Sequence, residues 1–269
     1  LRTVYTAIFR YDDTLFEHLI IQTVRLPRVI AGVVIGAALA VAGALLHGLT
    51  AHPVASPALL GINEGASFAV VLGVCLLGSP SLCGDGPLAI IGAAAAAIIV
   101  YTLGSVGRAG ITPVKLTLSG VIFTALTGAV TTAILVLDRQ TFDQIRFWTV
   151  GSVAGRDWEI IGWMAPFILV GLVGSLLMSR QITTISLGQD IAQGLGQNTT
   201  RVKLIAAVMV VLLAGGTVGI AGPVGFVCLV LPLGVRALSV GGSLGICPFE
   251  GVGGCFWVGG SDGLVRDGL

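Results

Sequence analysis

Long apolar runs separated by short polar segments dominate this sequence. Six runs are close to the roughly 20 residues that a helix needs to cross the hydrocarbon core of a bilayer. They cover residues 29–49, 58–77, 88–103, 116–137, 160–178 and 204–220. A seventh run, 224–233, is too short to span alone, and residues 1–28 are polar enough to form a loop. The pattern predicts an all-α, polytopic transmembrane domain of six or seven spans over residues 29–232.

The composition excludes most other protein classes. Of 269 residues, 55% are hydrophobic and 10% are charged, whereas soluble domains carry about 25% charged residues. A soluble domain, a nucleic-acid binder, a disordered chain and a disulfide scaffold are therefore all excluded. The 40 glycines suggest tightly packed membrane helices, because small residues let helix backbones approach closely.

Ionisable residues are almost absent from the predicted spans. Only His47 and Glu64 fall within them, and both lie near a span end. A charge at the bilayer centre costs roughly 2.5–3.5 kcal/mol on insertion scales, and ion-coupled transporters accept that cost because the charge performs the coupling. This pattern argues against a secondary transporter and predicts that a partner supplies the energy for any uphill transport.

No enzymatic site is predicted on this chain. Neither of its two lysines, Lys115 and Lys203, follows a glycine-rich loop, so there is no nucleotide-binding P-loop. No histidine follows His52, which removes the H-E-x-x-H pattern of zinc proteases. We expect no catalytic residue, no metal ligand and no cofactor.

Two arginines mark the start of the first span. Arg25 and Arg28 lie one helical turn apart, with Pro27 suited to a first turn where its missing N–H costs nothing. Their side chains have two interpretations. They reach lipid phosphates at the membrane surface, or they dock the carboxylates of a partner.

Aromatic residues gather between the fourth and fifth long runs. Trp148 ends the stretch 144–148, and Trp158 and Trp163 follow after a short gap. Aromatics beside charges favour an interfacial belt. Contact with a transported substrate is the alternative.

A short polar segment, 186–196, separates the last two long runs. Ser186 with Gln189 fits a capping box, and Gly196 is placed to stop a helix. Leu187, Ile191 and Leu195 share one helical face. The segment predicts a surface amphipathic helix, which either rests on the bilayer or docks in a groove of a partner.

The sixth run ends in a cluster of glycines beside a proline. This composition predicts a broken helix, and discontinuous helices at membrane depth line cavities in transporters. The residues of this predicted translocation path are Gly215, Gly216, Gly219, Gly222, Pro223 and Gly225.

Six blocks in order give the chain a family resemblance. They are RLPRVIAGVVIGAALAVAGALLHGLT, HPVASPALLGINEGASFAVVLG, TPVKLTLSGV, FDQIRFWTVGSV, SLGQDIAQGLG and VGIAGPVGFVCLVLP, which run from Arg25 to Pro232. Together they resemble the FecCD-type permease subunits of bacterial iron-chelate and cobalamin ABC importers. FDQIRFW and INEGASFAVVLG look most like the permeases for ferric catecholate siderophores such as ferric enterobactin.

The resemblance implies a partial version of a ten-span importer permease in the bacterial inner membrane. Such permeases work as pairs, homo- or heterodimeric, with the pore between them. Each pair binds two cytosolic ATPase subunits and a periplasmic siderophore-binding protein, and no nucleic acid. Arg25 and Arg28 match positions that pair with glutamates of the binding protein. The cytosolic segment that couples to the ATPase matches Leu187, Gly188, Gln189, Asp190, Ala192, Leu195 and Gly196.

The sequence also departs from this family. The span that usually precedes RLPR is absent, and His47 and His52 stand where the family tends to have Gln and Asn. After Pro232 the family pattern stops, and residues 233–269 hold 11 glycines without an apolar run of spanning length. A frameshift near codon 232 would give such a tail. Two alternatives follow: a stand-alone secondary transporter or channel, and a truncated fragment without transport activity.

Overall fold

The structure is a computed structural model, and the part of the chain that it describes is mainly helical. It describes residues 18, 21–50, 57–58, 60–77, 82–106, 113–149, 151, 158–186 and 188–223. The elements in this part of the chain are η1 (Ile21–Arg25, a π-helical turn), α3 (Leu26–Thr50), α4 (Ile62–Leu77), α5 (Leu82–Ser105), α6 (Pro113–Leu137), α7 (Arg139–Thr149), α8 (Trp158–Ser186), α9 (Gln189–Gly194) and α10 (Thr199–Ala221).

Each of the six predicted spans is confirmed as a helix. Five helices are long and apolar enough to cross a membrane, and α4 is a shorter apolar helix. The first helix begins earlier than expected, because η1 continues directly into α3, so the prediction of a loop is wrong for residues 21–28. Ile21 is buried against the bundle, which explains why the helix extends into this segment. The short run 224–233 lies outside the described residues.

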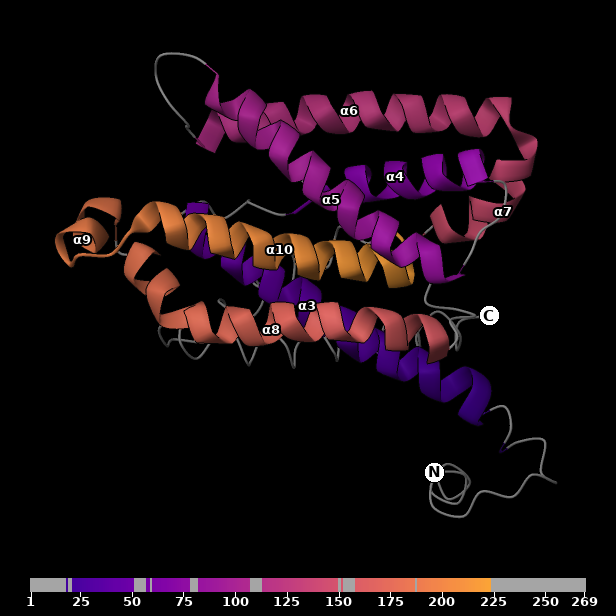
Figure 1. Ribbon diagram of the computed structural model, residues 1–269, viewed down its shortest axis with the longest axis horizontal. Coiled ribbons are helices and arrows are strands. Elements are labelled where there is room, and N and C mark those ends of the chain that lie inside the picture. The colour runs from indigo at the N-terminus through magenta and orange to yellow at the C-terminus, as the bar shows by residue number, and fades with distance from the viewer. Residues whose placement is uncertain are drawn as a thin grey trace, which may run out of the picture.

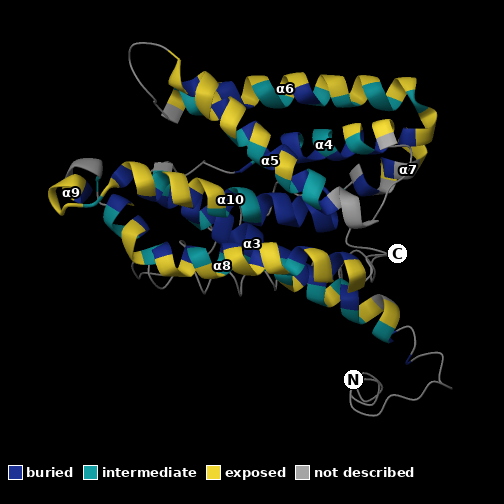
Figure 2. Cartoon of the chain, in the orientation of Figure 1, coloured by how far each residue is buried: buried dark blue, intermediate teal, exposed yellow. Residues whose placement is uncertain are grey.

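Helices α8 and α10 run roughly alongside each other, α3 and α5 cross them obliquely, and α10 lies at the centre (Figure 1). Helix α10 packs against α3, α5 and α8, while α6 contacts α4, α5 and α7 at the edge of the bundle. Within the most apolar stretch of each helix, 67% of residues are buried in α10 but only 17% in α6. Figure 2 shows this contrast between the buried inner half of α10 and the uncovered α6. The face of α6 is therefore available to lipid or to another chain.

Glycines of α10 are packing positions and do not interrupt the helix. A Cβ at Gly215 would lie 3.0 Å from Ile90 Cα, and one at Gly219 would lie 3.0 Å from Gly86 Cα. A Cβ at Gly216 would lie 2.9 Å from the Ile168 side chain. The prediction of a broken helix is wrong at these three positions, since α10 continues to Ala221. The bare glycine surface lets α5 and α8 approach α10 more closely than any side chain would allow.

A second glycine contact joins α4 to α5. Gly65 and Gly92 face each other so closely that a Cβ at Gly92 would overlap the carbonyl oxygen of Gly65 and the Ala69 side chain. Backbone cannot move away as a flexible side chain can, so this contact requires glycine. The contact therefore sets how closely α4 and α5 pack.

Replacing Gly92 by alanine should therefore destabilise the bundle by about 1–3 kcal/mol, the usual cost of overpacking. We expect a lower midpoint of thermal unfolding for the detergent-solubilised protein. Gly128 is the matched control, because a Cβ there meets nothing within 4 Å. Gly128→Ala should leave the midpoint unchanged or raise it, since alanine is the better helix former. Equal midpoints for the two variants would contradict this account of the contact.

Candidate functional site

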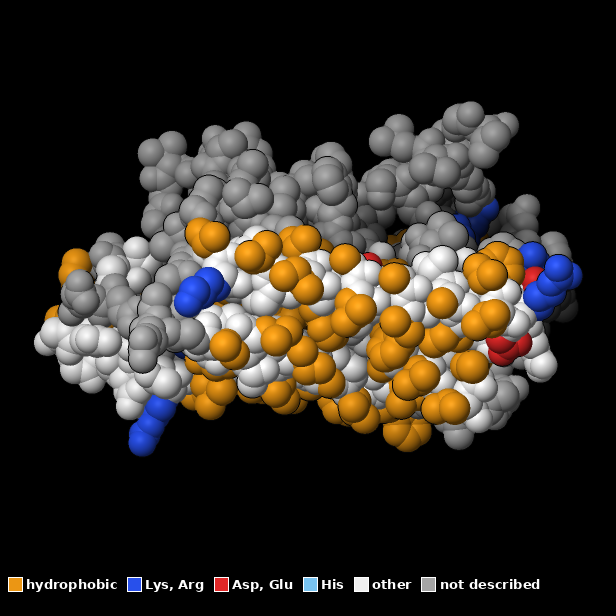
Figure 3. Space-filling view, turned by 90° about the horizontal axis from the view of Figure 1, so that it is seen from above, with side chains coloured by type: hydrophobic (Ala, Val, Ile, Leu, Met, Phe, Trp, Pro, Cys, Tyr) orange, Lys and Arg blue, Asp and Glu red, His pale blue; other side chains and the backbone are white. Residues whose placement is uncertain are grey.

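Most of the charged side chains visible in Figure 3 lie at the two ends of the bundle, and hydrophobic side chains cover much of the surface between them. One end carries α9 and the start of α10, and the other carries α7 and the starts of α3 and α8 (Figure 1). This distribution fits a chain that spans a bilayer, because lipid offers no partner to a charge at its centre. The candidate functional residues lie at these two ends.

The link between α8 and α10 is a compact, hydrogen-bonded turn of helix. Gly188 precedes α9 with a φ of +132°, and Gly196 follows it with a φ of +78°. After the helix, the N–H of Gly196 donates to Gln193 O at 2.9 Å and the N–H of Gln197 donates to Ala192 O at 3.0 Å. This pair of bonds is a Schellman motif, in which glycine takes the left-handed position. The prediction that Gly196 stops the helix is confirmed.

The predicted capping box is wrong. Ser186 belongs to α8, where its hydroxyl donates to Thr183 O at 2.8 Å, and Gly188 occupies the N-cap without a side-chain hydrogen bond. Helix α8 thus extends further than expected, and the hydroxyls of Thr183, Thr184 and Ser186 in its last turns donate to carbonyl oxygens of the preceding turn. A side-chain cap is found instead at α10, where Asn198 Oδ1 accepts from Arg201 N at 3.2 Å.

Helix α9 buries one side and exposes two large apolar residues. Ala192 is fully buried, whereas Ile191 is 54% exposed and Leu195 is 71% exposed. Leu187 and the side chains of Gln189 and Asp190 lie outside the described part of the chain. The link is braced on both sides, because Gln197 Nε2 donates to Gln181 O of α8 at 3.0 Å and Gln193 Nε2 lies 3.4 Å from Thr199 Oγ1 of α10. The link is therefore hydrogen-bonded to both long helices.

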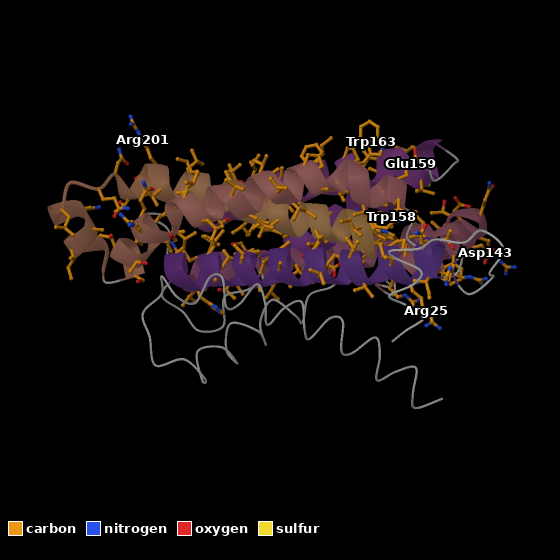
Figure 4. All side chains as sticks on the ribbon, turned by 90° about the horizontal axis from the view of Figure 1, so that it is seen from below. Arg25, Asp143, Trp158, Glu159, Trp163 and Arg201 are labelled. Carbon is orange, nitrogen blue, oxygen red and sulfur yellow. The ribbon has the colours of Figure 1, made fainter. Side chains whose placement is uncertain are left out.

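At the opposite end, Arg25 closes η1 and projects from the bundle (Figure 4). Its side chain is exposed, while Arg28 is half-buried in the first turn of α3. Trp158 Nε1 donates to Gln22 O at 3.3 Å and so ties the start of α8 to η1. Of the two arginines, Arg25 is the more accessible to a partner.

Helix α7 is a short amphipathic helix that the sequence did not reveal. Its apolar side inserts Ile145 and Trp148 into the core, where they are 3% and 9% exposed. Trp148 therefore contacts protein and does not belong to an interfacial belt, whereas Trp158 and Trp163 are about half exposed at this end. The spacing of Ile145 and Trp148, three residues apart among polar neighbours, was the available signal.

An aspartate begins this helix. Asp138 Oδ2 accepts from the Thr141 hydroxyl at 2.5 Å, and Oδ1 accepts from Gln140 N at 3.1 Å. These bonds, with the Thr141 hydroxyl foremost, favour the ionised carboxyl and lower the pKa of Asp138. Asp138 thus caps the amino-terminal end of α7.

The end of α10 lies directly against α7. Gly222 follows the helix with a φ of +81°, and a Cβ there would overlap the carbonyl oxygen of Trp148. Pro223 comes next, and Gly225 lies outside the described residues. Of the predicted path residues, Gly222 and Pro223 therefore directly follow the end of α10.

The link between α8 and α10 should be sensitive to its left-handed glycine. A Cβ at Gly196 meets nothing within 4 Å, so Gly196→Ala tests backbone strain alone. We expect a cost of about 1–2 kcal/mol, seen as roughly 5- to 30-fold faster amide hydrogen exchange at residues 192–198. Gly194 also has open space around it but is helical, and Gly194→Ala should slow exchange or leave it unchanged. Similar acceleration in both variants would show that the left-handed turn is not what holds the link.

Comparisons with known proteins assign this architecture to a family. A model of the FecCD transport family matches residues 1–267, so the match continues beyond Pro232, where the sequence pattern was expected to stop. The probable siderophore transport system permease protein YfiZ of Bacillus subtilis is 40% identical over 251 residues, which cover 93% of this chain and 75% of that protein. The ferric enterobactin transport system permease protein FepD of Escherichia coli is 40% identical over 213 residues, which cover 79% of this chain and 64% of FepD.

A solved structure supports the same assignment. A metal-chelate type ABC transporter in an inward-facing conformation has a TM-score of 0.83 to this chain, with 25% identity over 98% of this chain and 87% of the other. PsaBC from Streptococcus pneumoniae shares the fold at 18% identity, with a TM-score of 0.61 and coverage of 88% and 83%. The membrane-spanning bundle, the short α9 link and the match over almost the whole sequence lead to one conclusion: this chain belongs to the FecCD transport family, whose members are permease subunits of ABC importers.

Proposed function

We propose that this chain is the permease subunit of an ATP-driven importer for ferric siderophores in a bacterial inner membrane. In this role it forms part of the translocation path and performs no chemistry, since ATP is hydrolysed on a separate subunit. Relatives named for siderophore, ferric citrate, hydroxamate and enterobactin transport support an iron chelate as the substrate class. The binding protein is expected to select among these chelates.

The observation that carries the proposal is the α9 link. Two large apolar side chains, Ile191 and Leu195, are exposed on a short helix that is held between glycines and bonded to both α8 and α10. Exposed apolar anchors on a rigid element are typical of a docking surface for a partner. We assign this surface to the cytosolic ATPase. The coupling segment comprises Leu187, Gly188, Gln189, Asp190, Ala192, Leu195 and Gly196.

This assignment places the opposite end of the bundle in the periplasm. Arg25 is exposed there, and Arg28 lies one turn further along α3. We propose that the guanidinium of Arg25, and the part of Arg28 that remains accessible, pair with carboxylates of a siderophore-binding protein. Charge-assisted hydrogen bonds of this kind orient a partner as well as attract it.

The uncovered face of α6 suits the second permease subunit. Its exposed apolar residues include Leu118, Ile122 and Leu126, and α6 lies at the edge of the bundle. We propose that a second copy or a related permease packs here and that the pore lies between the two subunits. The glycine-rich end of α10, including Gly222 and Pro223, is proposed to bend as the path opens to each side.

The coupling role predicts that charge on the apolar side of α9 disrupts ATPase binding. Burying an isoleucine or leucine side chain contributes about 1.5–3 kcal/mol, so Ile191→Asp or Leu195→Asp should weaken association at least roughly tenfold. Co-purification of the ATPase with the membrane-inserted permease measures this directly, and uptake should fall in parallel.

Val106 supplies the matched control. It is 72% exposed at the end of α5, near the same end of the bundle as α9, but it is not part of the link. Val106→Asp should leave ATPase association within about twofold of the parent protein. Normal association of the α9 variants, or equal loss in the Val106 variant, would exclude α9 as the coupling element.

A further inference from the structure

An open groove between α8 and α10 is lined by two arginines. The groove has a volume of about 480 Å³ and lies beside the α9 link. Arg180 enters it from α8 and Arg201 from the first turn of α10, and none of the lining residues is acidic. In the part of the chain that the structure describes, no salt bridge joins either arginine to another residue. Figure 4 shows Arg201 projecting from this end of the bundle.

The polar wall of the groove is suited to a phosphate group. Asn198 caps α10 here, so the groove contains the amino-terminal end of a long helix, whose dipole favours anions. Gln197 also lines the groove, and its Oε1 is buried without a hydrogen-bond partner. This oxygen can accept a hydrogen bond from a hydroxyl group. The groove thus offers cationic donors for a phosphate and an acceptor for an alcohol.

The rest of the groove wall is mixed. Gln181 and Thr184 of α8 add polar side chains, and Leu195, Val202 and Ile205 add apolar ones. Beyond it, exposed side chains continue toward the middle of the bundle on both helices, including Leu177 on α8, which is 77% exposed, and Val208 on α10, which is 48% exposed. A ligand that fits both parts has a phosphate head, hydroxyl groups and an acyl chain.

We propose that this groove binds the headgroup of an anionic phospholipid, such as phosphatidylglycerol, from the leaflet at the α9 end. Arg180 and Arg201 hold the phosphate, Gln197 accepts from a headgroup hydroxyl, and the acyl chains follow the exposed faces of α8 and α10. Basic pockets between membrane helices recognise anionic lipids by this combination of charge and depth. Because Gln197 bonds to α8 and continues directly from the α9 link, the bound lipid would steady the link that connects the two long helices. The inference requires a membrane-spanning chain but not the proposed transport activity.

Native mass spectrometry of the protein extracted from mixed phosphatidylglycerol and phosphatidylcholine nanodiscs tests this proposal. The parent protein should retain phosphatidylglycerol preferentially. R180Q/R201Q should retain roughly 10- to 30-fold less, since each cation near the surface contributes to anionic-lipid binding. R180K/R201K keeps both charges and should stay within about threefold of the parent. Both arginines are exposed, so these substitutions remove no packed side chain.

A second pair of lysines provides a control for net charge. Lys115 and Lys203 lie near the start of α6 and of α10, at the same end of the bundle, and neither lines the groove. K115Q/K203Q removes the same charge and should keep lipid retention within about threefold of the parent. Equal lipid loss in this control would show that lipid retention depends on the overall surface charge and not on the groove, and it would overturn the proposal.

Two further results would also overturn it. Unchanged phosphatidylglycerol retention in R180Q/R201Q, with reduced co-purification of the ATPase, would show that the groove is a protein contact. Displacement of the lipid by millimolar inorganic phosphate, with equal stabilisation of the protein by phosphate alone, would show a site for a free anion. Leu195 lines the groove as well as the α9 surface, whereas Ile191 does not line the groove. Failure of Ile191→Asp to affect the ATPase would therefore leave the lipid result untouched, so the two proposals fail separately.

Discussion

Close approach of helix backbones at glycine is the interaction on which this bundle depends. Lipid tails are as apolar as leucine, so membrane helices gain no hydrophobic stabilisation by leaving lipid for each other. They associate through van der Waals packing, which requires short distances. The glycines of α10 allow α5 and α8 to approach it closely. Gly65 and Gly92 allow the same close approach between α4 and α5. The central position of α10 follows from this bare surface, as does the alignment of the helices that carry the functional ends.

The same packing explains how a movement of the α9 link would reach the rest of the bundle. Helices α8 and α10 are held along their length, where Gly171 of α8 faces Leu213 of α10, and α9 bridges the ends that carry Ser186 and Thr199. Left-handed glycines on both sides fix the direction of the short helix without a flexible loop. A partner that moves α9 therefore acts on two packed helices together. Such an arrangement is appropriate for a permease that receives its energy from an ATPase.

The sequence predicted the spans well, because a run of about 20 apolar residues rarely forms anything other than a membrane-spanning helix. It predicted the ends of helices poorly. Helix α8 continues through Ser186, whose hydroxyl donates to Thr183 O, and this bond within one turn forms only where the chain is already helical. The glycines of α10 were interpreted as breaks, since composition alone does not show that Gly86 and Ile90 of α5 lie against them. The groove of Arg180 and Arg201 was not predicted either, because its two walls come from different helices and meet only after packing. The stop at Gly196 was predictable, since it is encoded within a few adjacent residues.

ATP-dependent uptake tests the central claim most directly. The chain would be reconstituted in proteoliposomes with its second permease subunit, its ATPase and its binding protein, and accumulation of radiolabelled ferric enterobactin or another ferric siderophore would be followed. The account predicts accumulation that requires ATP and is unaffected by an uncoupler of ion gradients. Accumulation without ATP that collapses when the uncoupler is added would contradict it and would identify the chain as a secondary transporter.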